Sequence, residues 1–275
     1  MNKPIPSPEQ LSTLTPAERR AYKIADFITS YLKWLTIPWN LVFMRLLIAF
    51  CVGRRVEFLG LEHLNFVTSQ SRVMLVANHR SFFDFFSIAY RFLLVWNVPR
   101  KMFFPVRANF FYESWIGVWV TAIMGGWAMF PPIFRDAKKK PFNKYAIERV
   151  IYEFRKSPSI IGFHPEGKRN TSTDPYSFLE ARGGIGQVLL EVEDTIVVPL
   201  FIYGLSNKMG TEIKRSWSSQ RKQYPIHLMF GPPVSMEKFR GMENTPETGQ
   251  LIAEECMNAI RKMGEEHRQK YNPSV

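Results

Sequence analysis

A histidine and an aspartate lie five residues apart in the stretch Asn78-His79-Arg80-Ser81-Phe82-Phe83-Asp84. The apolar residues 73–77 before it predict a buried strand, and a helical pattern follows it. In open α/β sheets, ligands bind where such strands end. An imidazole there can act as a general base if a carboxylate on its other ring nitrogen fixes the tautomer. Because residues five apart on a regular helix point about 140° apart, His79 must lie before the helix to pair with Asp84.

The same residues also allow a purely structural interpretation. Ser81 and Asp84 form a pair like a capping box, with Ser81 at the N-cap and Asp84 at the third helical position. Caps of this kind are frequent. The pair therefore needs support from another part of the chain before it is assigned to catalysis.

A second polar stretch follows another apolar run. Residues 159–163 predict a buried strand, and His164-Pro165-Glu166-Gly167-Lys168-Arg169-Asn170 comes directly after it. Glu166 could accept a hydrogen bond from a substrate hydroxyl while Lys168 and Arg169 hold a phosphate. A surface turn with a salt-bridged glutamate is the alternative interpretation of this segment alone.

The two stretches hold two histidines and two carboxylates, a composition that raises the question of a metal. His79, Asp84, His164 and Glu166 do not have the spacing of a zinc site, and a His-x-Glu pair is not diagnostic. We therefore expect no metal. The chain also lacks a Gly-x-Ser-x-Gly elbow and a P-loop.

Composition and charge narrow the classes of protein. Of 275 residues, 46% are hydrophobic and 15% aromatic, which excludes a disordered chain. The formal charge of +12 favours anionic partners such as nucleic acid, lipid headgroups or phosphorylated substrates. Cys51 and Cys256 form neither a disulfide framework nor a metal pattern, so a reducing compartment is the simplest inference. The polar first twenty residues do not resemble a secretory signal.

The N-terminal region combines aromatic, apolar and basic residues. Thr15-Pro16-Ala17-Glu18 predicts a helix start. In the apolar residues 34–50, Pro38 is expected to break or kink the helix, and the uninterrupted run after Arg45 is shorter than the ~20 residues of a membrane span. We therefore expect residues 1–53 to form a membrane-associating hairpin of amphipathic helices that lies in the interface. An ordinary buried helical hairpin is the alternative.

The remaining chain alternates strands with helices, which predicts an α/β domain over residues 54–275 with a mainly parallel sheet flanked by helices. The expected strands are residues 54–59, 73–77, 101–106, 159–163, 195–203 and 226–230, with residues 127–134 at best an edge strand. The expected helices are residues 82–95, 109–124, 143–156, 184–192 and one from Thr245 to before Tyr271.

Taken together, the two polar stretches resemble a known family. The residues from Asn78 to Asp84 match the Asn-His-x-Ser-x-x-Asp block of glycerolipid acyltransferases of the 1-acylglycerol-3-phosphate acyltransferase (lysophosphatidate acyltransferase) type. Pro165-Glu166-Gly167-Lys168-Arg169-Asn170 matches the Phe-Pro-Glu-Gly-Thr-Arg-Ser block of the same family. Ala181-Arg182-Gly183-Gly184 and Val197-Val198-Pro199-Leu200 resemble the later blocks, and the order and spacing agree over about residues 55–235.

The chain departs from this pattern at a few positions. His164 stands where the family has Phe, and Lys168 stands where it has Thr. The second block is only loosely present over residues 126–135, where Arg135 is the candidate for its arginine. These departures bear on the identity of the acyl acceptor more than on the type of reaction.

The resemblance implies transfer of a fatty acyl group from an acyl thioester, either acyl-CoA or acyl carrier protein, to the free hydroxyl of lysophosphatidate, giving phosphatidate. His79 would be the general base and Asp84 its orienting carboxylate. The implied substrate-binding residues are Arg135, Glu166, Gly167, Lys168 and Arg169. The family uses no cofactor besides the thioester. We expect anionic membrane lipids as partners and a monotopic or peripheral location at the cytoplasmic face of a membrane.

Other classes of function remain open at this stage. Nucleic-acid binding would suit the charge, but the aromatic residues lie in apolar helical runs and no recognition motif is present. A non-catalytic lipid-binding protein would not need His79 and Asp84 together. Among enzymes, acylation of another lysolipid, such as a lysophospholipid with a larger headgroup or a lyso-aminolipid, is the nearest alternative.

Overall fold

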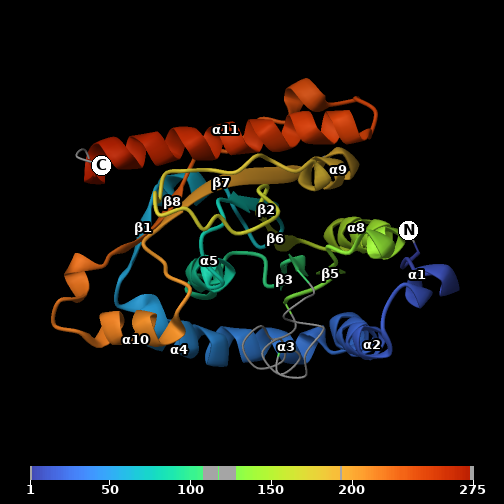
Figure 1. Cartoon of the computed structure of the whole chain (residues 1–275), viewed down its shortest axis with the longest axis horizontal. Coiled ribbons are helices and arrows are strands. Elements are labelled where there is room, and N and C mark those ends of the chain that lie inside the picture. Colours follow the sequence, from blue (N-terminus) through green and yellow to red (C-terminus); the bar gives the residue numbers. More distant parts are fainter. Residues whose placement is uncertain (1, 108–116, 118–127, 193, 273–275) are drawn as a thin grey trace.

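The computed structural model describes residues 2–107, 117, 128–192 and 194–272 of the chain (Figure 1). Its centre is a six-stranded sheet with the strand order β1-β8-β7-β2-β6-β3. The strands are β1 (Val56–Leu59), β2 (Arg72–Ala77), β3 (Met102–Phe103), β6 (Ser159–Phe163), β7 (Thr195–Tyr203) and β8 (Ile226–Phe230). Neighbours β7, β2, β6 and β3 are parallel, whereas β8 runs antiparallel to β7 and β1 runs parallel to β8. The expected mainly parallel α/β sheet is confirmed.

Helices cover both faces of this sheet (Figure 1). The helix α11 (Pro246–Tyr271) and the helix α9 (Gly184–Glu191) lie over one face. The helix α5 (Asp84–Leu93) and the N-terminal helices lie under the other, with α10 (Met209–Trp217) beside them. The helix α8 (Lys140–Lys156) leads into β6 and contributes to the core on both sides.

The two faces of β2 show how alternation builds this three-layer arrangement. Val73, Leu75 and Ala77 belong to the core on the α5 side, and Met74 and Val76 belong to the core on the α11 side. A strand buried on both faces has no polar position, which is why residues 73–77 form a continuous apolar run.

The N-terminal helices differ from expectation at Pro38. The capped start at Thr15 and Pro16 is confirmed: α2 (Pro16–Tyr31) begins with a capping box between Thr15 and Glu18. After a break at Leu32, however, one helical run continues from Lys33 to Gly53. It comprises α3 (Lys33–Trp39), α4 (Arg45–Ile48) and π-helical turns at Asn40–Met44 and Ala49–Gly53.

Of the break or kink expected at Pro38, the break is therefore wrong. Proline removes one backbone N–H and crowds the preceding turn, but the helix passes through Pro38 and continues into a π-helical turn at Asn40–Met44. As a result, Lys33–Gly53 is 21 residues long, with a mean hydropathy of 1.8 over its most apolar stretch. By length and composition this single helical run is long enough to cross a membrane, whereas two amphipathic helices were expected here.

Around residues 101–135 the structure is more irregular than the pattern predicts. The single strand expected over 101–106 is divided into β3 and β4 (Val106–Arg107). Of the described part of the expected edge strand, residues 128–134, only Pro132–Ile133 forms a strand, β5, and it pairs with β4 in a separate two-stranded sheet. Apart from residue 117, the helix expected over 109–124 lies outside the described residues.

The proposed division of the chain at residue 53 stays a prediction. Residues on both sides of this boundary share one core, because Tyr22, Met44 and Ile48 belong to the same buried cluster as Leu75 and Ile88. Short helices α1 (Pro8–Ser12) and the 3₁₀ turns at residues 61–64, 137–139, 221–223 and 237–239 complete the described elements.

Candidate active site

The polar stretches of the sequence meet at one edge of the sheet. The strands β2, β6 and β7 are adjacent and parallel, so their carboxyl ends point the same way. His79 follows β2, His164 follows β6, and a loop of residues 204–208 follows β7. The structure thus brings the two motifs together and adds a third loop to them.

His79 and Asp84 form a direct pair. His79 lies in the loop between β2 and α5, and its Nδ1 is 2.9 Å from Oδ2 of Asp84. The imidazole side chain is 22% exposed, whereas the carboxylate is almost completely buried at 1%. Since Nδ1 faces the carboxylate, Nε2 is the ring nitrogen left to exchange a proton with a substrate.

Asp84 also shapes the turn that carries His79. Its Oδ2 accepts hydrogen bonds from the backbone N–H groups of Arg80 and Ser81, each at 2.9 Å. Asp84 therefore both pairs with His79 and caps the turn, as the two interpretations of the sequence proposed separately. The capping geometry differs from the expected one, in which Asp84 is the third helical residue. Instead, α5 begins at Asp84 itself, and the Ser81 hydroxyl accepts from the N–H of Phe83.

Burial sets the protonation of the pair. It raises the pKa of Asp84 to about 6, against the favourable effects of His164 and of the backbone N–H groups. Burial and the nearby Arg169 cation lower the pKa of His79 to about 3. The imidazole is therefore neutral at neutral pH, which is the form that a general base requires.

The main chain of His79 is held from both sides by the second motif. Its N–H donates to Oε2 of Glu166 at 2.5 Å, and its C=O accepts from the N–H of Asn170 at 2.8 Å. The other oxygen of Glu166 accepts from the N–H of Leu179 at 2.8 Å. Glu166 is only 2% exposed, and burial raises its pKa. The sequence predicts that Glu166 contacts the acceptor, whereas the structure directs both carboxylate oxygens toward backbone amides.

His164 packs against the ring of His79. The two imidazoles are stacked, with centroids 4.0 Å apart and planes only 4° from parallel. Nδ1 of His164 lies 2.9 Å from the carbonyl oxygen of Ala77, and Phe85 packs against the His164 ring at 4.4 Å. Burial and His79 lower the pKa of His164 to about 3. This neutral ring takes the place of the phenylalanine found in the family pattern.

The side chains of His79, Asp84 and His164 are close enough to raise the question of a metal again. One ligand atom from each lies within 4.8 Å of the others. An imidazole binds a metal through a lone pair in the plane of its ring. Because the two rings are parallel and 4.0 Å apart, one ion cannot lie in both planes. The stack is thus poorly arranged to let both histidines bind one ion.

The predicted substrate-binding residues that follow Glu166 in the second motif are exposed. Gly167 has φ +63°, a left-handed conformation that favours glycine, and its N–H donates to the carbonyl of His164. Lys168 and Arg169 follow on the surface, and Arg169 donates from Nη1 to Oδ1 of Asn207 at 2.7 Å. Both cations are thus exposed in the loop after β6, and the charge of Arg169 acts on the imidazole of His79.

Arg135 is not joined to this group. It is exposed in the segment after β5, and among the described residues it makes no hydrogen bond or ion pair with His79, Asp84 or Glu166. Part of the block expected over residues 126–135 lies outside the described residues.

Sequence reasoning did not identify Asn78 or Asn207 as site residues. Asn78 is fully buried, and its side chain pairs with both the N–H and the C=O of Ile202, which extends the β2–β7 ladder to the His79 corner. The sequence feature that could have identified Asn78 is its position directly after the apolar residues 73–77, at the end of a buried strand. Asn207 lies in the loop after β7, and no local pattern singles it out.

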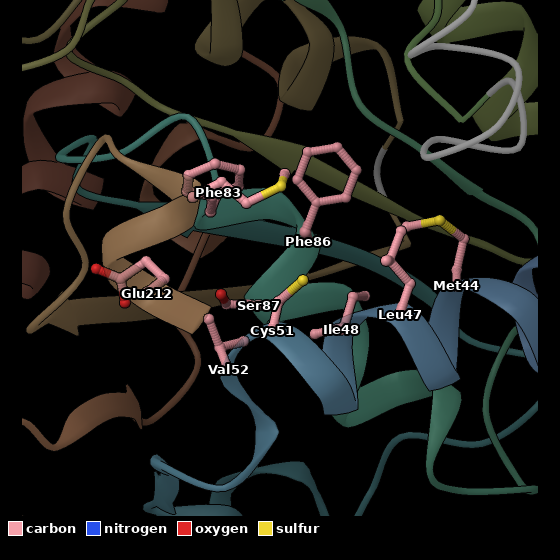
Figure 2. Close-up of a pocket in the computed structure, with 10 residues that line it drawn as sticks. Met44, Leu47, Ile48, Cys51, Val52, Phe83, Phe86, Ser87 and Glu212 are labelled. Carbon is pink, nitrogen blue, oxygen red and sulfur yellow. The ribbon is translucent and has the colours of Figure 1, made fainter. Parts of the chain in front are cut away.

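Apolar cavities lie beside this edge, between α5 and the N-terminal helix. One is lined by Met44, Ile48 and Val52 of that helix, by Phe83 and Phe86 from the start of α5, and by residues of α10 (Figure 2). A second shares Met44 and Phe86 and continues toward Met102 and Met129. His79 lines neither cavity, but Phe83 connects the first cavity to the loop that carries it.

Comparison with known proteins identifies the family of the chain. A family model described as Acyltransferase matches residues 55–203, which is more than half of the chain. The match extends from the start of β1 to the end of β7 and includes both motifs. No curated protein matches the chain.

The raised pKa of Asp84 predicts a gain of stability when its charge is removed. The native state binds this proton more tightly than the unfolded chain, so the ionised carboxylate destabilises the fold above pH 6 and does not below about pH 4. We expect Asp84→Asn to raise the melting temperature at pH 8, with a gain in unfolding free energy of up to about 3 kcal/mol. This gain should shrink as the pH falls from 6 to 4. An unchanged or lower melting temperature at pH 8 would contradict the prediction.

Proposed function

The chain belongs to the Acyltransferase family, and on that premise we propose that it transfers a fatty acyl group from an acyl thioester to the free hydroxyl of lysophosphatidate, giving phosphatidate. The observation that carries this proposal is the pairing of neutral His79 with buried Asp84 at a sheet edge bordered by Lys168 and Arg169. A base beside fixed cations is suited to a substrate that carries a hydroxyl near a phosphate.

The pair can perform the acyl transfer without a covalent enzyme intermediate. Nε2 of His79 takes the proton of the acceptor hydroxyl as its oxygen attacks the thioester carbonyl. The carbon–sulfur bond then breaks, and the leaving thiolate takes the proton back from the imidazolium. Asp84 keeps Nδ1–H aligned and stabilises the imidazolium formed in between, as in the base-plus-orienter arrangement of serine proteases. The reaction as proposed needs no metal or prosthetic group.

The remaining motif residues bind and position the substrates in this proposal. Lys168 and Arg169 bind the acceptor phosphate, and the arginine offers the planar donor geometry that suits a phosphate. Glu166 acts through the backbone of His79. The apolar cavity beside Phe83 takes part of an acyl chain (Figure 2). The thioester is acyl-CoA or acyl carrier protein.

We further propose that the outer face of the N-terminal helices binds the membrane surface. This face carries large apolar side chains that are 43–71% exposed and, apart from the adjacent Trp34 and Leu35, recur every three or four residues: Ile24, Phe27, Tyr31, Trp34, Leu35, Trp39, Val42, Leu46 and Phe50. Arg45 lies exposed among them. An apolar stripe with aromatic residues and interspersed cations is typical of helices that lie in the membrane interface.

The packing of the helix supports a flat orientation. Met44, Ile48 and Val52, on its inner face, are buried in the core beside α5, and the segment near Gly53 contacts α10. A helix that crossed the bilayer in this arrangement would draw α10 and its charged side chains to the same depth, at a high energetic cost. The helix therefore suits a monotopic protein, and we propose the cytoplasmic face because both acyl thioesters are cytoplasmic compounds.

The reaction can be tested with purified wild type and His79→Ala in detergent. We expect thiol release from a long-chain acyl-CoA that depends on lysophosphatidate and yields phosphatidate, and a loss of ~10²–10⁴-fold in the variant because the general base is missing. Thiol release that depends instead on a different lysolipid would redirect the acceptor assignment. If neither acyl-CoA nor acyl carrier protein supports transfer to any lysolipid, the proposal fails and non-catalytic lipid binding takes its place.

The two possible roles of Glu166 predict different kinetics. If its carboxylate holds the backbone of His79, Glu166→Gln presents an amide N–H to one of two backbone donors and displaces the base. We expect kcat to fall by ~10-fold or more while KM for the acceptor changes little. A change confined to acceptor KM would instead indicate direct contact with the acceptor. Glu180→Gln, an exposed glutamate near Leu179, serves as the control.

Membrane docking can be tested by placing charges on the outer helix face. We expect Trp34→Asp with Leu46→Asp to reduce sedimentation with phosphatidylglycerol-containing vesicles by ~10-fold or more, because both exposed side chains lose their apolar contact with the interface. Leu251→Asp, an exposed leucine on α11 at the opposite face of the sheet, should bind as wild type does (Figure 1). Equal binding by all three proteins would contradict the proposed docking face.

A further inference from the structure

We propose that Asn207 is a positioning residue for acyl transfer, whose side-chain carbonyl fixes the Arg169 guanidinium at the His79 corner and thereby sets the affinity for the phosphate of the lysolipid acceptor. This inference rests on the proposed function. It concerns a loop that lies just beyond the residues matched by the family model.

The loop that carries Asn207 is anchored on both sides. It leaves β7 through Gly204, whose φ of +87° and close approach to the carbonyl of Pro225 require glycine. The carbonyl of Ser206 accepts from the hydroxyl of Ser81 at 2.6 Å, and its N–H donates to Glu212 at 3.0 Å. Glu212 is in turn held by a buried ion pair with Arg55. The backbone around Asn207 is therefore fixed relative to the His79 corner.

The side chain of Asn207 joins the two motifs. Its Oδ1 accepts from the backbone N–H of Phe82 at 3.1 Å and from Nη1 of Arg169 at 2.7 Å. Its Nδ2 lies 3.5 Å from the carbonyl of Arg80. One amide thus bonds to the backbone of the first motif and to the guanidinium of the second.

Arg169 needs such a partner because it is exposed. A long side chain on the surface samples many rotamers, and ordering it only when the substrate binds costs affinity. The hydrogen bond from Nη1 to Asn207 is the one that orders this guanidinium among the described residues. The same Asn207 oxygen accepts from the N–H of Phe82 in the loop that carries His79, so the guanidinium is ordered at that loop, where its charge contributes to the lowered pKa of the imidazole.

The hydrogen-bond partner of Arg169 is the neutral amide of Asn207, and this neutrality favours binding of an anion by the arginine. Among the described residues, Arg169 has no carboxylate within salt-bridge distance. An amide oxygen occupies one guanidinium N–H and leaves both the full positive charge and the remaining donors for a phosphate. An aspartate at residue 207 would position the arginine equally well but would compete with the phosphate for it.

The test compares Asn207→Ala with wild type on whichever phosphate-bearing lysolipid the wild type acylates best. We expect the acceptor KM to rise about 3–10-fold, with kcat and the KM for acyl-CoA within about twofold of wild type, because only the acceptor phosphate contacts Arg169. Asn207→Asp should raise the acceptor KM at least as much. Asn244→Ala removes an exposed asparagine whose side chain bonds to Gln187 and Glu191 far from the site, and should match wild type.

A double-mutant cycle separates this role from a structural one. If Asn207 acts through Arg169, then adding Asn207→Ala to Arg169→Ala should not raise the acceptor KM further. If the increases in acceptor KM caused by the two substitutions multiply in the double variant, the inference is overturned, because Asn207 would then act through its hydrogen bond to Phe82 and independently of Arg169. A wild-type KM in Asn207→Ala would also overturn it.

Failure of the proposed function is distinguishable from failure of this inference. If wild type prefers a phosphate-bearing lysolipid other than lysophosphatidate, the acceptor assignment is wrong while the Asn207 comparison still applies. If wild type acylates no lysolipid, both proposals are overturned.

Discussion

The main chain of His79 is fixed by the corner that follows the neighbouring strand, and the rest of the site depends on this constraint. Glu166 holds its N–H and Asn170 its carbonyl, so residues about ninety positions away determine where the imidazole stands. This arrangement is possible because β2 and β6 are parallel neighbours that end at the same edge. The two motifs are therefore parts of one structural unit, and neither can be placed correctly without the other.

The buried carboxylate of Asp84 has two structural functions at this corner. One oxygen orients the imidazole and receives two backbone N–H groups of the turn that carries it. Burying the ionised carboxylate is energetically unfavourable, and the raised pKa of Asp84 reflects this. In the proposed mechanism, stability and activity thus make opposite demands on this residue.

The sequence predicted best where a local rule determines the structure. Residues 195–203 and 226–230 form strands with the bounds expected, and the Thr15 and Thr245 caps begin helices where predicted. The His79–Asp84 pair was predictable because strand ends and helix starts are local features. Pro38 misled because a tertiary arrangement overrode a local rule: the inner face of the helix packs on the core on the C-terminal side of the proline.

Contacts between distant segments left no comparable signal. The buried orientation of Glu166 depends on Leu179 and His79, and the contacts of Asn207 depend on the alignment of β7 with β2. Nothing in the residues adjacent to Asn207 indicates a partner on another strand end. The stack of His164 on His79 is likewise a product of strand order, although the unusual histidine was visible in the sequence.

The helical run from Lys33 to Gly53 has two faces with different tasks, and this limits how the protein can move. Its inner side chains, among them Met44 and Ile48, close the hydrophobic core beneath α5. Swinging the helix outward would open that core to water, so it cannot serve as a hinged arm that is extended and withdrawn. The outer face of the helix is therefore always exposed for binding while the protein is folded. In the proposed membrane binding, the time that the protein stays at the surface then depends on the strength of this contact, and movement of the helix does not control it.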